Sequence, residues 1–460
     1  LNTSTNNFAA AVGITSGRNV AITDEDTIVL GAATVSGTYA VTATTGGITD
    51  SGTQEIAGVT TLVAGSTNDI TLNTSTNNFA AAVVVTSGRN VAIIDENAID
   101  LGASTVSGTY AVTATAGGIS NSGNLVITGA ATFITTAADS NIILGQSGNA
   151  FASTVTMKAG DGTDEDFNNI TFVDTNAIRL HTSAASAGDL YINAETDGAV
   201  GGALSVTATN ADITQTVALA VTGTTTLAAG SSNDITLGNT SNNFATVVIT
   251  SGRNVTLVDA GAIDLGASTV SGTYAVTATS GGGITDSGVL AITGTSTLTA
   301  ADEQSIILDQ SSTFGTVAFV ASSGNLKNVT INDSDEFNLS ALTLAKAGGA
   351  GGNLTVTAGG AITDTATLEI AGVTTLEAGS TNDITLNTST NNFAEAVVIT
   401  SGKDVTLVDE DAIDLGASTV SGTYAVTATA GGISNSGNLV ITGAATFITT
   451  EADFNIILGQ

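Results

Sequence analysis

The stretch VTLVDAGAIDLGASTVSGTYAVTAT, at residues 255–279, decides the fold of this chain. Apolar residues alternate with polar ones within it, as at Val255 and Leu257, and β-branched residues are frequent throughout. A period of two is typical of β-strands, and the glycine and serine pairs between the short apolar runs suit turns. The stretch therefore predicts strands of about four to seven residues, joined by tight corners.

Related stretches recur along all 460 residues, and six phenylalanines mark equivalent places in them. The sequence numbers of successive markers differ by 71, 72, 93, 70 and 79. A sandwich has no need to repeat its sequence in this way, whereas a solenoid is built from repeats. The markers are Phe8, Phe79, Phe151, Phe244, Phe314 and Phe393, and they divide the chain into units at approximately 8–78, 79–150, 151–243, 244–313, 314–392 and 393–460.

We predict an all-β fold, a right-handed parallel β-helix (β-solenoid) that runs through residues 1–460 as one continuous solenoid. Each coil of about 22 residues would contribute three short strands, so a repeat of about 71 residues would hold about three coils. The 22 surplus residues of the 93-residue spacing lie around His181–Gly202 and would form one complete coil. The surplus of the 79-residue spacing would form a longer corner loop.

A longer repetition overlies these units. Ser75–Gln146 reappears at Ser389–Gln460 with ten differences, and duplication of a block of several repeats explains the copy. The opening residues also belong to an LNTSTNN segment that recurs at Leu72 and Leu386. We therefore expect the chain to be a fragment of a longer repeat protein.

The composition excludes several classes of protein. The chain has no cysteine, proline or tryptophan, which excludes a disulfide scaffold and thiol chemistry. Its 8 basic and 41 acidic residues give a net charge of -33, which argues against nucleic acid and anionic membrane as partners. No membrane span is expected, because apolar runs such as Phe79–Val85 are far shorter than the roughly 20 residues required.

The most regular polar pattern is an aspartate that follows a basic residue by six positions. We expect the aspartates to cap turns at corners; the competing hypothesis is a stacked column that binds metal or ligand. Coils would separate successive aspartates of such a column by roughly 14 Å. The pairs are Arg18 and Asp24, Arg89 and Asp95, Arg253 and Asp259, Lys327 and Asp333, and Lys403 and Asp409, while Asp174 follows Asn168 instead of a base.

Other residues invite weaker hypotheses. Calcium is conceivable at the acidic loop Gly160–Asp166 and, second, at the turn Asn332–Glu336, although neither has the spacing of a calcium loop. The single histidine, His181, belongs to the surplus segment, and a catalytic or metal role is disfavoured. Corners such as Asn73–Asn78 would form stacked amide ladders. The tyrosines of the SGTYAVTAT motif are expected to pack inside rather than to bind sugar rings, at Tyr39, Tyr110, Tyr274 and Tyr424.

Three sets of motifs resemble filamentous-haemagglutinin-like bacterial exoproteins. They are GGITDSG at 46–52 and 282–288, GGISNSG at 117–123 and 431–437, and TTTLAAGSSNDITL at 224–237. Members of that family are large secreted or surface-bound β-helical proteins with β-strand repeats. The resemblance implies export, display outside the cell, and a role in adhesion or fibre formation.

From these observations we expect a secreted structural fibre or adhesin shaft, located outside the cell or on its surface and without catalytic activity. We assign no catalytic, cofactor-binding or metal-binding residues, and no cofactor apart from the conceivable calcium. Expected partners are the chain itself, end to end or as its own continuation, and a host, cell-surface or polysaccharide ligand. The alternatives are a β-helical carbohydrate-binding or polysaccharide-cleaving protein and a calcium-dependent binding module.

Overall fold

The computed structural model describes residues 1, 3–161, 168–181, 189–192, 199–347, 349–451 and 453–459. These residues form strands, corners and no helix, and parallel strands stack as a β-solenoid of about 20 coils. This confirms the predicted all-β parallel β-helix. The chain divides into two compact bodies, an N-terminal body of residues 1–239 with 243–245 and a C-terminal body of residues 240–242 with 246–460.

The strands are short because each coil closes within about two dozen residues. In the N-terminal body they are β1 Val12–Gly17, β2 Val20–Asp24, β3 Ile28–Val35, β4 Tyr39–Ala43, β5 Ile48–Asp50, β6 Gln54–Ile56, β7 Thr60–Val63, β8 Ile70–Leu72, β9 Asn78–Phe79, β10 Val83–Ser87, β11 Val91–Asp95, β12 Ile99–Leu101, β13 Ser104–Val106, β14 Tyr110–Ala114, β15 Ile119–Asn121, β16 Leu125–Ile127, β17 Ala131–Thr135, β18 Ile142–Leu144, β19 Ala150–Phe151, β20 Val155–Lys158, β21 Ile170–Asp174, β22 Ile178–His181, β23 Asp189–Ile192, β24 Ala199–Val200, β25 Leu204–Ala208, β26 Ile213–Gln215, β27 Ala220–Ala228 and β28 Ile235–Leu237.

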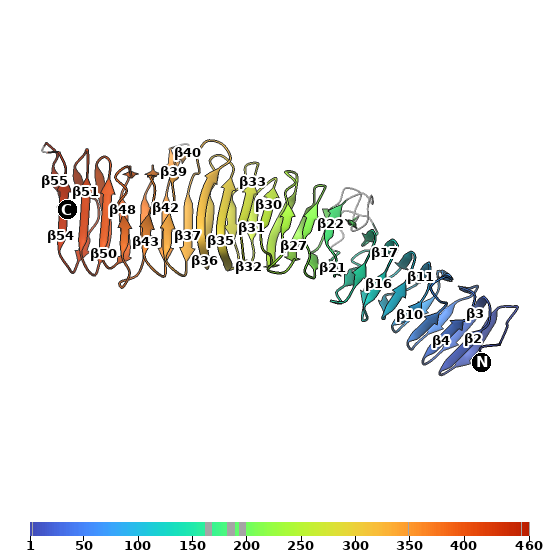
Figure 1. Cartoon of the computed structure of the whole chain (residues 1–460). Coiled ribbons are helices and arrows are strands. Elements are labelled where there is room, and N and C mark those ends of the chain that lie inside the picture. The colour runs from blue at the N-terminus through green and yellow to red at the C-terminus, as the bar shows by residue number, and fades with distance from the viewer. Residues whose placement is uncertain are drawn as a thin grey trace. The chain divides into compact units, whose positions relative to one another are not determined.

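The C-terminal body has the same kind of strands (Figure 1). They are β29 Asn243–Ser251 from residue 246 on, β30 Val255–Asp259, β31 Ile263–Leu265, β32 Ser268–Val270, β33 Tyr274–Ala278, β34 Ile284–Asp286, β35 Leu290–Ala300, β36 Ile306–Ala321, β37 Val329–Asp333, β38 Phe337–Leu339, β39 Leu342–Leu344, β40 Lys346–Ala347, β41 Ala350–Gly351, β42 Leu354–Ala358, β43 Ile362–Asp364, β44 Leu368–Ile370, β45 Thr374–Glu377, β46 Ile384–Leu386, β47 Asn392–Phe393, β48 Val397–Gly402, β49 Val405–Asp409, β50 Ile413–Val420, β51 Tyr424–Ala428, β52 Ile433–Asn435, β53 Leu439–Ile441, β54 Ala445–Thr449 and β55 Ile456–Ile457.

The second repeat shows the plan of one unit. Counted from β10, just after the marker Phe79, to β19, which ends at the marker Phe151, it contains ten strands. Nine of them fall into three classes that alternate along the chain: class a is β11, β14 and β17, class b is β12, β15 and β18, and class c is β13, β16 and β19. Strands of one class stack in parallel on successive coils, as Tyr110 on β14 does on Ala131 of β17. The tenth strand, β10, links this repeat to the one before.

Consecutive repeats are offset by one class where they meet. The first class a strand of a repeat pairs with the last class b strand of the repeat before it, as Val91 does with Ile70. The same pairing recurs within each body, between Ile142 and Ile170, Ile306 and Val329, and Ile384 and Val405. A coil takes three strands and a repeat has ten, so a repeat spans three and one third coils. This agrees with the predicted value of about three coils per repeat and adds one strand to it.

The 22 surplus residues of the third repeat do not form a coil, contrary to the prediction. The paired Ile142 and Ile170 have a sequence separation of 28, against 21 for the equivalent Ile70 and Val91, so seven extra residues precede β21. The other fifteen follow β22, because Ile170 pairs directly with Leu204 at a sequence separation of 34, in place of the usual 19. Among the described residues of this surplus, Asp189–Ile192 form β23, which pairs with both β20 and β22 and so adds one strand without completing a coil. Most of the predicted coil, residues 182–188 and 193–198, lies outside the described residues.

The surplus of the 79-residue spacing does form a longer corner, as predicted. The paired Val329 and Leu354 have a sequence separation of 25, six more than Val91 and Tyr110. The extra residues contain the antiparallel hairpin β40–β41, in which Lys346 pairs with Gly351. Every other strand pairing described in the chain is parallel.

The core follows from the period of two. In β30 and β33 every second side chain is buried, and the tyrosine that begins β33 is fully enclosed. Aromatic rings meet across the interior, with centroids 5.9 Å apart for Tyr110 and Phe133 and 6.1 Å apart for Phe133 and Phe151. Inward side chains of successive coils therefore form one continuous apolar interior within each body.

Candidate functional site

The repeated aspartates end the first class a strand of each repeat and are buried. Asp24, Asp95, Asp174, Asp259, Asp333 and Asp409 are each less than 5% exposed. In every repeat one carboxylate oxygen accepts a hydrogen bond from the backbone N–H two residues on, at distances between 2.7 and 3.1 Å. They therefore cap the corner that follows, as predicted.

The same carboxylates also reach back to the preceding repeat. The backbone N–H of Phe79 donates to Asp95 Oδ2 at 2.8 Å, and Phe393 donates to Asp409 Oδ2 at 3.0 Å. The marker phenylalanines and the aspartates thus meet at each joint between repeats. Burial raises the pKa of Asp95, and it raises the pKa of Asp333 and Asp409 to about 6.

These aspartates do not form a column. Asp24 ends β2, which stacks with the class a strands of the first repeat. Asp95 ends β11, which stacks on β8, a class b strand of the first repeat, and so lies on a different face. Within each body, successive aspartates therefore lie on successive faces of the solenoid. Within the described residues, no three histidine, aspartate or glutamate side chains come together as a metal site. The described aspartates cap corners, and Asp95 accepts its hydrogen bonds from backbone N–H groups and not from a basic side chain in a pocket.

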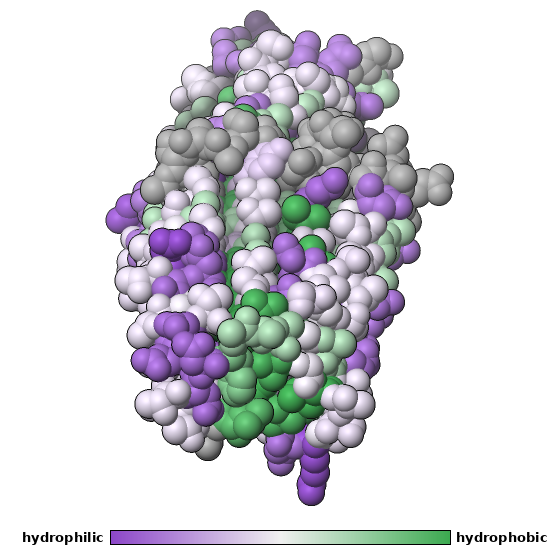
Figure 2. Space-filling model, turned by 90° about the vertical axis from the view of Figure 1, so that its right-hand side faces the viewer, coloured by the Kyte–Doolittle hydropathy of each residue, from purple (hydrophilic) through white to green (hydrophobic). Residues whose placement is uncertain are grey.

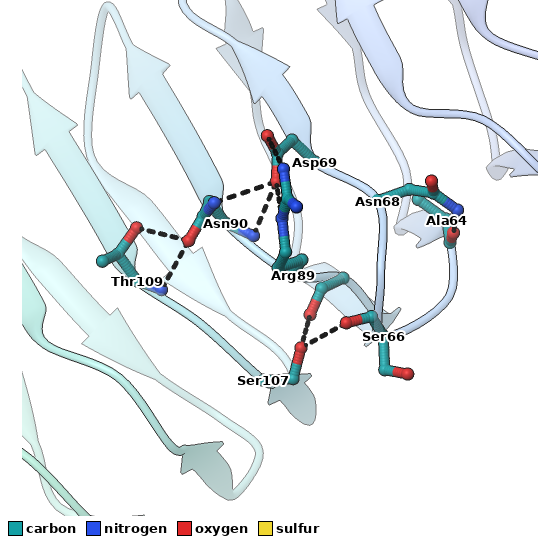
Figure 3. A network of polar contacts seen from close by, with 9 residues as sticks. Ala64, Ser66, Asn68, Asp69, Arg89, Asn90, Ser107 and Thr109 are labelled. Carbon is teal, nitrogen blue, oxygen red and sulfur yellow. Dashed lines mark hydrogen bonds and ion pairs between the residues drawn. The ribbon is translucent and has the colours of Figure 1, made fainter.

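The basic residues pair elsewhere, one coil back (Figure 3). Arg89 Nε and Nη2 donate to the two carboxylate oxygens of Asp69, each at 2.8 Å. This two-pronged contact, with Asn90, lowers the pKa of Asp69 to about 2. Lys403 contacts Asp383 at 3.5 Å and Asp404 at 3.0 Å. The six-residue spacing between base and aspartate therefore reflects two separate roles, an exposed ion pair and a buried cap.

A ladder of side-chain oxygens runs beside this ion pair. Asp69 Oδ1 accepts from the backbone N–H of Asn90 at 3.1 Å, and Asn90 Oδ1 accepts from the N–H of Thr109 at 3.1 Å (Figure 3). Asn328 and Asn353 repeat it, since Asn353 N donates to Asn328 Oδ1 at 3.1 Å. Each rung joins equivalent residues one coil apart. Side-chain ladders thus exist, but they lie before class a strands and not at Asn73–Asn78, where we expected them.

A buried asparagine replaces the expected ladder at that corner. Asn77 Oδ1 accepts from Gln54 N at 2.9 Å, and its Nδ2 donates to Asp50 Oδ2 at 2.7 Å. Its backbone oxygen accepts from Glu96 N, in the next repeat, at 2.7 Å. Asn391 makes the same three bonds later in the chain. Sequence reasoning missed this role, although asparagine stands two residues before the marker phenylalanine at 6, 77, 149, 242 and 391.

The remaining candidate residues have structural roles or lie outside the described residues. Tyr39, Tyr110, Tyr274 and Tyr424 are at most 1% exposed, so they pack as predicted and offer no sugar-stacking surface. In the turn Asn332–Glu336, Asp335 N donates to Asp333 Oδ1 at 3.0 Å. His181 ends β22 opposite Tyr191. Of the loop Gly160–Asp166, residues 162–166 lie outside the described residues.

One protein family covers nearly the whole chain. The family described as repeats of unknown function (DUF5649) matches residues 17–86, 88–158, 168–251, 252–321, 326–400 and 402–460. The chain belongs to this family. No curated protein and no solved structure matches it.

The DUF5649 matches begin where the structure places the joints. Five of the six start three residues before the first class a strand, as at residue 88 before Val91 and residue 402 before Val405. A DUF5649 repeat thus opens with the strand that ends in the buried aspartate. The described residues contain no helix with the length and apolar character needed to cross a membrane.

Proposed function

We propose that this DUF5649 chain is a structural part of a secreted fibre or adhesin, in which stacked repeats hold other regions away from the cell. The observation that supports this most is the joint between repeats. The Asp95 side chain accepts from Phe79 N of the repeat before, and the Asn77 backbone oxygen accepts from Glu96 N of the repeat after, so that hydrogen bonds continue across the boundary. In such a protein, stability adds up from contacts between neighbours, and length grows with the number of repeats.

The charge and the display of polar residues fit an exposed role. A net charge of -33 keeps neighbouring molecules apart, and the described ion pairs lie at the surface. The resemblance to filamentous-haemagglutinin-like exoproteins supports export. We assign no catalysis to the chain, because the buried aspartates act as caps.

The first and last coils support the proposed association with further coils. Val12 and Ile14 are partly exposed, whereas the equivalent Val83 and Val85 are fully buried. Figure 2 shows apolar surface at the end of the molecule where Figure 1 places the N terminus. At the other end Ile457 is 64% exposed. We propose that such edges pair with an end coil of a second copy.

Two experiments test this proposal. Electron microscopy and fibre diffraction of the purified chain should show elongated particles with a repeat of about 4.8 Å along their length. Antibodies against the chain should label intact producing cells. Compact particles without that repeat, or labelling only after lysis, would contradict a fibre outside the cell. Cleavage of a polysaccharide that is lost on substitution of one aspartate cluster would favour the enzymatic alternative.

A further inference from the structure

A shallow hollow lies on the surface just before the corner that carries the hairpin β40–β41. The hollow lies over β39, β44 and β47 in the C-terminal body and has a volume of about 270 Å³. Three outward side chains on adjacent strands form a row along it. Thr343 pairs in register with Glu369, and Glu369 pairs with Asn392. Ala345, Ala371 and Ala394 line the hollow beside this row and supply apolar surface.

An ion pair spans the strand ends beside the hollow. Lys346 Nζ, in β40, lies 2.5 Å from Glu395 Oε1, two residues beyond β47 and two coils further along the chain. The hairpin that presents Lys346 needs glycine, since Gly349, Gly351 and Gly352 have φ values of 84°, 92° and 77°. The corner is therefore shaped by its own sequence, and its lysine is already paired with Glu395.

The first repeat contains the same row without this corner. Thr34, Glu55 and Asn78 stack in the same register, but Asn78 Nδ2 donates to Glu55 Oε1 at 3.0 Å. Ala81 stands there in place of Glu395. In the fifth repeat Asn392 Nδ2 turns instead to Asp411 Oδ2 at 3.3 Å.

The consequence is an available carboxylate in the hollow. Among the described residues no hydrogen bond reaches the carboxylate of Glu369, and Lys346 is paired with Glu395. A carboxylate in a strongly acidic chain attracts a cation, and a charge-assisted bond is about twice as strong as a neutral one. The hydroxyl of Thr343 and the amide of Asn392 can bond hydroxyl groups, and the three alanines can contact C–H groups.

We propose that this hollow binds an amino sugar through its free ammonium group, which Glu369 accepts while Thr343 and Asn392 bond the ring hydroxyls. The volume lies just below the usual range of small-molecule sites, about 300–1,000 Å³, and suits one ring rather than an oligosaccharide. This site does not depend on the proposed fibre role, because it uses only one corner of one repeat.

Titration of the full chain with glucosamine, followed by NMR, tests the site. Saturable binding in the millimolar range is expected, with N-acetylglucosamine and glucose about tenfold weaker or more, because they lack the charge. Glu369→Gln should weaken glucosamine binding by a similar factor. Glu55→Gln is the matched control in the first repeat and should leave binding unchanged.

The outcomes separate a site from general attraction to an acidic protein. Binding that Glu369→Gln does not weaken, or that Glu55→Gln weakens equally, would overturn the proposal. So would equal binding of N-acetylglucosamine, or no saturable binding at all. Circular dichroism should show that each variant keeps its β-structure. Failure of this site would leave the diffraction and labelling tests of the fibre role unaffected.

Discussion

At the scale of single residues, buried polar side chains define the joints. Asn77 and Asp95 are fully buried, and each bonds backbone groups from more than one segment. A buried donor or acceptor that loses its partner costs about 1–3 kcal/mol, so one substitution here affects several groups at once. A polar corner residue that is exposed to water bonds fewer buried groups, so its substitution should cost less stability.

Asn77→Ala should destabilise the end of the first repeat by about 1–3 kcal/mol, because Gln54 N loses its buried partner and Asp50 loses one of its bonds. Hydrogen exchange of the full chain should show faster exchange in β6 and β9. The control is Asn73→Ala, an exposed residue of the same corner, which should change exchange little. Equal effects of the two substitutions would contradict the role of Asn77.

Tyr39→Phe should stabilise the chain by about 1 kcal/mol, because the Tyr39 hydroxyl is buried without a hydrogen-bond partner in the described part of the chain. Burial also raises the pKa of this hydroxyl. The control is Tyr110→Phe: the Tyr110 hydroxyl is also buried without a hydrogen-bond partner among the described residues, but Ser104 lies near it while Ala33 takes the equivalent place near Tyr39, so the gain should be smaller. A lower thermal midpoint for Tyr39→Phe would show that its hydroxyl has a partner after all.

At the scale of strands, the offset between repeats is the main finding. Ten strands per repeat on three faces place class a of one repeat over class b of the one before, as at Val91 and Ile70. The pairing is parallel and in register, so outward residues of neighbouring repeats lie side by side. Thr71 therefore stacks under Ala92, and not under Asp100 as three whole coils would require.

Cysteine pairs can verify the offset, since the chain has no cysteine of its own. Thr71→Cys with Ala92→Cys should form a disulfide on mild oxidation, because adjacent strands lie about 4.8 Å apart, near the lower end of the usual Cα separation for a disulfide. Thr71→Cys with Asp100→Cys should not. Mass spectrometry of digested protein would reveal the bond. Cross-linking of the second pair but not the first would contradict the offset and support three whole coils per repeat.

The sequence predicted the strands and their number per coil, but not their number per repeat. Period two at Val255 and Leu257 identifies buried strands directly. The length of a repeat, however, fits either three coils or three and one third, because the corners can be shorter or longer and absorb the difference. The partner of Arg89 was missed for the same reason: Asp69 lies one coil back, and only the register brings the two together. The caps were predictable, since a turn-capping aspartate acts within two residues.

At the scale of the molecule, buried and exposed carboxylates respond to acid in opposite ways. Burial raises the pKa of Asp286, Asp333 and Asp409 to about 6, whereas hydrogen bonds and cations lower the pKa of Asp69 and Asp404 to about 2. An unfolded aspartate titrates at about 3.9. Between about pH 4 and 6 the buried group holds more protons when folded, so stability rises as the pH falls through that window.

The thermal midpoint of the full chain should therefore be higher at pH 5 than at pH 7. Below about pH 4 the trend should reverse, because Asp69 and Asp404 lose the charge that pairs with Arg89 and Lys403. Replacing both Asp333 and Asp409 by asparagine should reduce the rise between pH 7 and 5. Asp69→Asn, at an exposed pair, should leave that rise intact. An equal rise in all three proteins would show that the buried joints do not carry it.

The offset of one strand per repeat also decides how the protein presents itself to its surroundings. Within each body, a group that occurs once per repeat points toward three different sides in its three copies. A ligand arriving from any direction would then meet some copy. Adding or losing one repeat would reorient everything beyond it by a third of a revolution, so a change in repeat number alters direction as well as reach.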